Sequence, residues 1–341
     1  MIKPRHFTAL AAATIFSVLL AAVLYASANR FSQGRVEGRA LAPELRANVN
    51  AVSAVEIAQG DKRLTLERNG DQWKIKDRAG YPANAEKARA LVLQLSSADL
   101  IDPKTANKDR FSLLELEDPG VKDSKSRGVK VIDDKGKPLA DVVIGKGRYE
   151  AFGSGRNGFY VRKAGDHQTW IALGDPKATA EVKDWVNTEI FRTDTGKIAR
   201  VTIEHPGEAP LVVEKGTDEK EKYKLANTPV PDGKKLKSGV LDQIPQGFSS
   251  IDYDDVRKLD ATPAGDKVSV VTLDAGSGLA VTFRLRKDGD DNWISLTATG
   301  TGDAKTQADQ INAKATGWEF RIPGWKADTI AKRSADLFET S

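Results

Sequence analysis

A glycine-rich stretch from residue 145 to 158 has the residue types that a phosphate-binding loop uses. It combines glycines with basic side chains: Gly145, Gly147, Gly153, Gly155, Gly158, Lys146, Arg148 and Arg156. A phosphate loop needs the pattern G-x-x-x-x-G-K-[ST] between a strand and a helix, because its amides must point at the anion. Extended segments flank this stretch, and the Gly-Lys-Ser/Thr ending is missing. We interpret it as a sheet loop, with partner binding through Lys146, Arg148 and Arg156 as the alternative.

Three polar residues near position 290 have the spacing that opens a calcium-binding loop. They are Asp288, Asp290 and Asn292. The sixth position of such a loop is glycine and the twelfth is a bidentate glutamate, but these positions are Trp293 and Thr299. We therefore interpret the stretch as a solvated hairpin turn.

The other titratable residues suggest no catalytic arrangement. The carboxylates Asp252, Asp254 and Asp255 would need burial for acid–base work, and their context is typical of an exposed loop. The histidines are isolated: His6, His167 and His205. The sequence contains no His-x-x-x-His pair and no G-x-S-x-G motif. It also contains no cysteine, which excludes thiolate metal sites, disulfides and a cysteine nucleophile. We expect no catalytic residue, metal or cofactor, although a serine triad assembled from distant positions stays open.

Tryptophans could form a carbohydrate or ligand platform, but their positions favour core packing. They lie in expected strands or at expected helix starts: Trp170, Trp185, Trp293, Trp318 and Trp325. Trp318 and Trp325 stand beside turn residues, so we expect these two to form an exposed aromatic edge for protein contact.

The composition is typical of a folded chain long enough for two domains. The 341 residues are 29% charged and 40% hydrophobic, with 52 basic and 48 acidic residues. The signs are balanced, with a net charge of +4. Nucleic-acid binding, which uses a clustered basic face, is therefore not expected.

The N-terminal segment, residues 7–28, is uncharged and apolar on all sides. About 20 such residues span a bilayer, and Lys3 and Arg5 favour a cytoplasmic N-terminus, residues 1–6. We expect a transmembrane anchor in the cytoplasmic (inner) membrane with the bulk of the chain on the periplasmic side. Ala26-Ser27-Ala28 fits a signal-peptidase site, so a cleaved signal peptide is the alternative. Residues 29–49 are polar and are expected to form a linker.

A first α+β repeat is expected over residues 50–196. Short alternating runs predict strands, and Asn69-Gly70 predicts a type I′ hairpin turn. Tyr81-Pro82-Ala83 ends the sheet segment, and Asn84 can cap a helix whose apolar residues are Ala88, Leu91, Val92 and Leu95. Asp175 and Pro176 predict a second helix, with an apolar stripe from residue 178 to 186.

A weaker copy of this pattern is expected over residues 197–341. Lys222-Tyr223-Lys224-Leu225 stands where Gln72-Trp73-Lys74-Ile75 stood, and residues 293–296 mirror residues 170–173. Pro245 would end the equivalent helix early. The expected fold class is α+β: an N-terminal transmembrane helix followed by a tandem duplication of mostly antiparallel sheet with packed helices, giving an elongated rod.

The order of several short motifs resembles a known bacterial family. These motifs are the Trp73 hairpin, Tyr81-Pro82-Ala83 before a helix, residues 114–119, Ile144-Gly145 and Tyr160-Val161. Together they resemble the family catalogued as domain of unknown function 4340. The resemblance implies single-anchor envelope proteins, some of them similar to auxiliary components of ABC-type export systems named after gliding motility, and it transfers no catalytic residues.

The sequence therefore favours a non-enzymatic, membrane-anchored envelope protein that makes protein–protein contacts. ABC transporter subunits are the partners that the resemblance implies. The alternative is an envelope module that binds glycan or lipid, which an exposed concave apolar pocket would favour.

Overall fold

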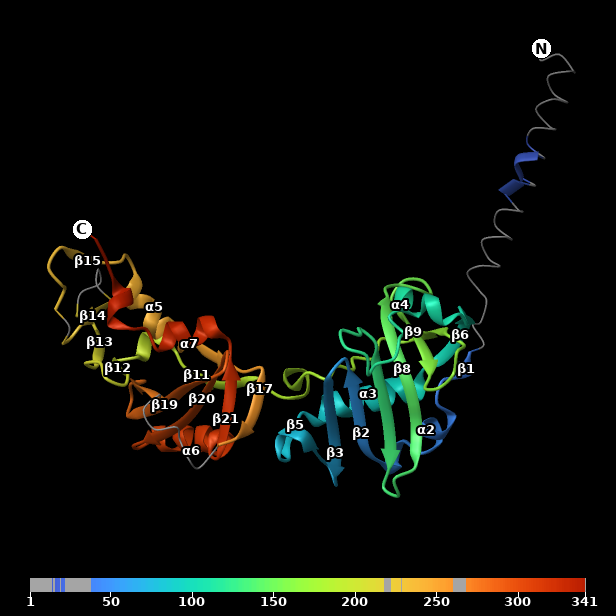
Figure 1. Ribbon diagram of the computed structural model, residues 1–341, viewed down its shortest axis with the longest axis horizontal. Coiled ribbons are helices and arrows are strands. Elements are labelled where there is room, and N and C mark those ends of the chain that lie inside the picture. The colour runs from blue at the N-terminus through green and yellow to red at the C-terminus, as the bar shows by residue number, and fades with distance from the viewer. Residues whose placement is uncertain are drawn as a thin grey trace, which may run out of the picture.

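The computed structural model describes residues 14, 16–18, 20–21, 38–217, 222–227, 229–259 and 268–340. Two lobes lie side by side along the long axis of the molecule (Figure 1). We refer to the elements β1 to β10 with their helices as the N-terminal domain, and to β11 to β22 with theirs as the C-terminal domain.

The expected N-terminal transmembrane helix needs correction. In the part of the chain that the structure describes, no helix is long and apolar enough to cross a membrane. A spanning helix needs roughly 20 consecutive residues. Only residues 14, 16–18 and 20–21 of the expected 7–28 segment are described, and the rest of that prediction lies outside the described residues.

The N-terminal domain is built on one ten-stranded antiparallel sheet in the order β1-β6-β10-β9-β8-β7-β2-β3-β4-β5. Its strands are β1 (Arg39–Ala40), β2 (Val52–Gln59), β3 (Lys62–Asn69), β4 (Gln72–Ile75), β5 (Tyr81–Ala83), β6 (Asp99–Pro103), β7 (Arg127–Asp133), β8 (Pro138–Arg148), β9 (Gly158–Lys163) and β10 (Trp170–Leu173). Its helices are α2 (Pro43–Ala47), α3 (Ala85–Ser97) and α4 (Phe111–Leu114), with 3-10 turns η1 (Val49–Ala51), η2 (Lys76–Arg78), η3 (Lys108–Arg110) and η4 (Val182–Trp185).

The C-terminal domain has an eight-stranded sheet in the order β14-β13-β12-β18-β19-β20-β21-β17, with the two-stranded sheets β11-β16 and β15-β22. Its strands are β11 (Glu189–Arg192), β12 (Arg200–Glu204), β13 (Leu211–Lys215), β14 (Tyr223–Leu225), β15 (Lys234–Leu236), β16 (Ser250–Asp252), β17 (Asp255–Lys258), β18 (Val268–Asp274), β19 (Leu279–Asp288), β20 (Asp291–Gly300), β21 (Trp318–Ile322) and β22 (Phe338–Thr340). Its helices are α5 (Val240–Gln246), α6 (Ala304–Ala315) and α7 (Gly324–Ile330), with η5 (Thr195–Lys197) and η7 (Ser334–Leu337).

The two large sheets share one strand order. The run β4-β3-β2-β7-β8-β9-β10-β6 corresponds strand by strand to β14-β13-β12-β18-β19-β20-β21-β17. This correspondence places β20 opposite β9 and β21 opposite β10. Trp318 at the start of β21 thus takes the place of Trp170 in β10, whereas the sequence had paired Trp170 with Trp293. The helix α6, inserted between β20 and β21, hid this relationship.

The helix α3 follows the sequence pattern closely. Its side chains Ala88, Leu91, Val92 and Leu95 are buried. The Asn84 side chain accepts hydrogen bonds from the amides of residues 86 and 87, as a helix cap does. The α5 helix ends one residue after Pro245, near the position where the sequence placed its end.

Two local predictions are wrong. The hairpin between β3 and β4 closes with Asn69 opposite Gln72, so Gly70 and Asp71 form its loop. Gly70 has a φ of 61°, but Asp71 is not left-handed, which fits a type II′ turn rather than type I′. The helix expected after Pro176 is only the 3-10 turn η4, because the buried Trp185 donates its indole N–H to the Thr179 carbonyl and bends the segment.

Candidate functional site

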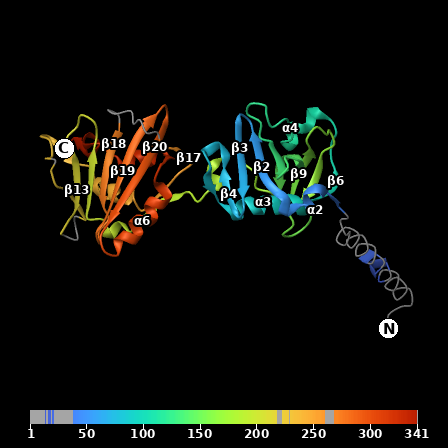
Figure 2. The ribbon, with the colours of Figure 1, turned by 90° about the horizontal axis from the view of Figure 1, so that it is seen from below.

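The junction between the two domains joins an edge of each large sheet. β5 is the last strand of the N-terminal sheet, and β17 is the last strand of the C-terminal one. In Figure 2, β17 lies on the side of its domain that faces the N-terminal domain. One continuous cluster of buried apolar residues includes side chains from both domains. The junction is therefore a packed interface.

Aromatic side chains form the centre of this junction. Tyr81 at the start of β5 packs edge-on against Trp318, with ring centroids 4.8 Å apart, and also contacts Tyr253 and Phe320. The Tyr253 hydroxyl donates to the Tyr81 hydroxyl at 3.1 Å. Burial raises the pKa of both phenols, so both keep their protons at neutral pH.

Charged pairs flank the aromatic centre. Arg78 in η2 donates from Nε and Nη2 to the two carboxylate oxygens of Asp255, at 2.6 and 2.8 Å. This hydrogen bonding raises the pKa of Arg78. Lys183 lies 3.7 Å from Asp254. Of the three carboxylates that the sequence indicated as an exposed loop, Asp254 and Asp255 therefore form charged pairs across the junction, whereas Asp252 is exposed. Only the fold brings Asp255 to a cation 177 positions away.

A buried ionic network lies next to the junction, on β17, β19 and β21. Glu319 is 4% exposed and bridges two guanidinium groups. Arg286 Nε donates to Oε1 at 2.6 Å, and Arg257 Nε donates to Oε2 at 3.0 Å. Arg257 also stacks over the Trp293 ring, with its guanidinium carbon 3.8 Å from the centroid, and pairs with Asp288 at 2.7 Å. That pairing lowers the pKa of Asp288.

The predicted partner-contact residues of the glycine-rich stretch share one surface. Lys146 and Arg148 lie at the end of β8 and Arg156 on the way to β9, and all three are exposed. Tyr149 between them is 79% exposed, a feature that the sequence reasoning missed. The turn is ordered by the Asn157 side chain, which accepts from the Glu150 amide at 3.0 Å. We call this surface, Lys146, Arg148, Tyr149 and Arg156, the basic tip.

Gly145 at the base of the basic tip has a steric role. A Cβ there would lie 2.1 Å from the Leu114 carbonyl oxygen, so glycine lets the 111–116 segment approach the sheet. The Arg127 guanidinium donates to the Gly145 carbonyl, and burial lowers the pKa of Arg127. This glycine therefore serves packing, and nothing in its surroundings resembles a phosphate cradle.

The two tryptophans expected to share an exposed edge lie in different environments. Trp318 is half-buried between Tyr81 and Lys258, whose Nζ is 3.7 Å from the ring centroid. Trp325 at the start of α7 is 65% exposed, with Lys326 Nζ 4.8 Å from its ring centroid. Trp318 therefore serves the domain junction, and Trp325 is the exposed member of the pair.

The family now follows from a comparison with known proteins. The family described as "Domain of unknown function (DUF4340)" matches residues 73–276. The chain belongs to this family. The DUF4340 match begins at the β4 tryptophan and ends in the turn after β18, so it contains Arg78, Tyr81, Tyr253 and Asp255 of the junction and the whole basic tip. No curated protein and no solved structure matches the chain.

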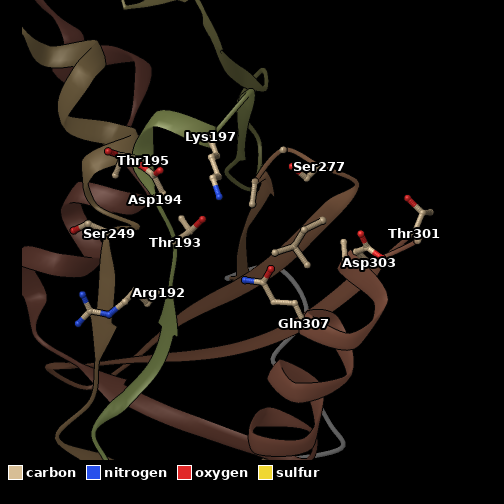
Figure 3. A pocket seen from close by; sticks show the side chains of 15 residues that line it. Arg192, Thr193, Asp194, Thr195, Lys197, Ser249, Ser277, Thr301, Asp303 and Gln307 are labelled. Carbon is tan, nitrogen blue, oxygen red and sulfur yellow. The ribbon is translucent and has the colours of Figure 1, made fainter.

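A cleft of this DUF4340 chain with a volume of about 930 Å³ lies in the C-terminal domain (Figure 3). Hydroxyl and charged side chains line it between η5, the 275–279 turn and the start of α6: Thr193, Thr195, Ser249, Ser277, Thr301, Asp194, Asp303, Arg192, Lys197 and Gln307. No aromatic ring is among its lining residues, all of which are described. Its hydroxyls and cations could hold a hydroxylated or anionic ligand by hydrogen bonds.

The described residues contain no group of three or more His, Asp or Glu side chains that could hold a metal ion. The stretch from Asp288 to Asn292, which the sequence indicated as a hairpin turn, connects β19 and β20. Asp288 pairs there with Arg257, and Gly289 has a φ of 59°. His167 is exposed, and His6 lies outside the described residues.

His205 is the one histidine of the described chain that is buried, and it makes the fold sensitive to pH. Its Nδ1 lies 2.8 Å from the Ser269 hydroxyl and its Nε2 lies 3.4 Å from the Lys332 carbonyl. Burial lowers its pKa from the ordinary 6.5. Since His205 in the unfolded chain has the ordinary, higher pKa, the unfolded chain binds the proton more readily than the folded one. The stability that neutral His205 contributes is therefore fully present above about pH 6.5 and is lost as the pH drops through the folded-state pKa.

We expect urea unfolding to show this dependence. Between pH 7.5 and pH 5 the wild type should lose more stability than His205→Gln, which cannot take up the proton. His167→Gln, at an exposed position, is the matched control and should retain the full pH dependence. If the free energy of unfolding changed equally with pH in the wild type and in His205→Gln, His205 would not be the source of the pH dependence.

Proposed function

We propose that this DUF4340 protein acts outside the cytoplasm by binding a partner protein, without catalysis, and that the basic tip is a contact surface. The observation that carries the proposal is the exposure of the tip. Lys146, Arg148 and Arg156 are exposed in the same stretch as Tyr149, which is 79% exposed, and none of these cations has an ion-pair partner in the described part of the chain.

The chemistry of the tip suits protein recognition. Arginine and tyrosine are enriched among the residues that dominate binding energy at protein interfaces. Three cations beside one anion, Glu150, attract an acidic surface and speed encounter with it. Three polar groups at the domain junction, by contrast, have structural partners: Arg78 binds Asp255, Glu319 binds two arginines, and Tyr253 binds Tyr81.

The location and the first partner to test come from the sequence. The uncharged segment 7–28 and its Ala26-Ser27-Ala28 end support export of the chain. The likeness of some DUF4340 members to auxiliary components of ABC-type export systems makes a transporter subunit with an acidic exposed surface the first candidate.

A matched pair of variants tests the basic tip. In Lys146→Ala/Arg148→Ala/Tyr149→Ala/Arg156→Ala we expect the recovery of the partner from gently solubilised native membranes to fall about tenfold or more, since losing two such hot-spot side chains costs at least 1.4 kcal/mol. The control Lys122→Ala/Lys135→Ala/Lys163→Ala removes three other exposed cations and should keep recovery within about twofold.

The thermal midpoint checks that both variants fold, and quantitative mass spectrometry measures the recovered partner. Equal recovery with the tip variant and the control would show that the tip is not the contact surface. Recovery of no stoichiometric partner with the wild type would contradict the proposed function itself.

The cleft of Figure 3 favours a second candidate, binding of a hydroxylated ligand such as a glycan. Its hydroxyl lining supports this, but sugar-binding sites usually add an aromatic face, which this lining lacks. Soluble glycan fragments titrated against the wild type and Gln307→Ala separate this alternative, because a cleft ligand would bind less well to the variant.

A further inference from the structure

The C-terminal sheet ends one strand earlier than its counterpart. In the N-terminal domain, β5 pairs with β4 and extends the sheet beyond it. In the described part of the C-terminal domain, β14 pairs only with β13, although β14 holds the place of β4. The following strand, β15, pairs with β22 in a separate sheet instead. Among the described residues, no strand therefore occupies the position beside β14.

The free edge of β14 presents the backbone N–H and C=O groups of two residues, Tyr223 and Leu225. The amide of residue 216 donates to the carbonyl of residue 222, and that of residue 226 donates to residue 212. Hydrogen-bonded pairs alternate along an antiparallel ladder, so Lys224 bonds to β13, and the N–H and C=O groups of Tyr223 and Leu225 point away from it. An incoming strand would find two donors and two acceptors.

The N-terminal domain shows how such an edge is filled. Trp73 and Ile75 lie opposite Ala83 and Tyr81, and Lys74 lies opposite Pro82. A proline is tolerated at Pro82 because that position faces away from the ladder and needs no donor. The edge thus takes an extended tripeptide whose outer two residues make the hydrogen bonds.

The described segment that follows β14, residues 229–235, is unsuited to fill the second edge. Tyr81 follows Ile75 by six positions (81 − 75), and the residue six positions after Leu225 (231 − 225) is Pro231. Proline has no N–H to donate where Tyr81 must donate. Residues 229–235 are all exposed, which fits a segment that does not pair with β14.

A hollow of about 620 Å³ lies between η5, the end of β13, the start of β14 and α5. Tyr223, Lys222, Pro245 and Asp242 line it. The Tyr223 hydroxyl lies 2.7 Å from the Thr195 carbonyl, to which it donates, and 3.1 Å from the Ile198 carbonyl, so the ring is fixed as one wall. This contact anchors β14 to η5 and holds the edge strand in place.

We propose that the β14 edge binds an extended segment of a partner protein as an added strand, with an acidic residue opposite Lys224. This inference rests on the proposed function, protein binding, and gives it a second surface. A second copy of the chain paired about a two-fold axis, with Tyr223 of each copy opposite Leu225 of the other, would place Lys224 opposite Lys224, and like charges directly opposite are repulsive. An acidic residue opposite Lys224 is attractive for the same reason.

The segment that fills the equivalent place serves as the probe. A peptide with the sequence of residues 78–85, and versions of it with Pro82→Asp or Pro82→Lys, are titrated to millimolar concentration into ¹⁵N-labelled full-length chain. We expect the amides of Tyr223 and Leu225 to shift and to become protected from exchange, and the Asp peptide to bind about threefold more tightly than the Lys peptide.

Two variants at one position isolate the backbone contribution. Leu225→Pro removes the outward N–H without touching the β13 ladder, whereas Leu225→Ala loses a similar part of the side chain and keeps the N–H. Binding should fall about tenfold or more in Leu225→Pro relative to Leu225→Ala, which amounts to about 1.4 kcal/mol.

Equal binding by the two variants, or shifts confined to other residues, would overturn strand addition at β14. Equal affinity for the Asp and Lys peptides would overturn the acidic partner. A concentration-dependent dimer that Leu225→Pro abolishes would replace the partner with a second copy. Because the probe is synthetic, a negative result here is distinct from the absence of a natural partner in the basic-tip experiment.

Discussion

Replacing Glu319 with alanine lowers the free energy of unfolding by about 3–5 kcal/mol, because it removes the buried carboxylate that the guanidinium groups of Arg286 and Arg257 share. Glu319 is 4% exposed, and its two oxygens bind Arg286 and Arg257 at 2.6 and 3.0 Å. Water cannot replace the carboxylate freely in so buried a place. Arg257 is further constrained by its stacking on Trp293, so it cannot turn outwards without losing that contact.

Denaturant unfolding of the full chain measures this effect. The control is Glu339→Ala, since Glu339 forms an exposed pair with Lys235 at 3.6 Å and its loss should cost less than about 1 kcal/mol. Glu319→Gln keeps the shape and the acceptor oxygen and should lie between the two. A Glu319→Ala chain as stable as Glu339→Ala would show that the arginines reach water and that the network contributes little.

Replacing Tyr253 with alanine is expected to cost a similar amount, about 3–5 kcal/mol, and to loosen the two domains. Tyr253 is 2% exposed and lies between Tyr81 and Phe320, with its ring centroid 4.9 Å from that of Phe320. Truncation opens a cavity in the middle of the junction and removes the only hydroxyl partner that the described residues give Tyr81.

Tyr253→Phe separates the ring from the hydroxyl. It keeps the packing and loses one hydrogen bond, so we expect a loss of about 1 kcal/mol and no change in shape. Small-angle scattering measures the radius of gyration, which increases when the two domains separate. Tyr253→Ala should therefore give a larger radius of gyration than the wild type at a denaturant concentration where the variant remains folded. An unchanged scattering curve would show that the other contacts, such as Arg78–Asp255 and Tyr81–Trp318, hold the junction without Tyr253.

The junction matters for the proposed function because it sets the geometry of two surfaces. The basic tip belongs to the N-terminal domain and the β14 edge to the C-terminal one. A partner that binds both gains from the fixed spacing, since the second contact is then intramolecular. Tyr253→Ala should therefore weaken binding of such a partner even though Tyr253 touches neither surface.

Local features of the fold could be predicted because their causes lie within a few residues. Asn84 caps α3 through amides two and three positions away, and Pro245 limits α5 because it lacks an N–H. The type of the turn at Gly70 was missed, since which two residues form the loop depends on the register of both strands.

The contacts across the molecule could not be predicted in the same way. The burial and the partners of Asp255 and Trp318 depend on residues far away in the sequence. Arg78 binds Asp255 and Tyr81 packs against Trp318 only because the two domains pack together. The insertion of α6 also displaced the second copy of the pattern, so a comparison by spacing matched Trp170 to Trp293 rather than Trp318.

The sequence by itself determined the family, the antiparallel strands, the cap of α3, the end of α5, and the basic residues of the tip. These properties depend on alternation, on proline and glycine geometry, and on short-range hydrogen bonds, which the order of residues specifies directly. The tertiary structure alone decided which carboxylates are buried, which tryptophan is exposed and which sheet edge stays open. Burial and pairing are properties of surfaces that meet only after folding, and a linear pattern does not contain them.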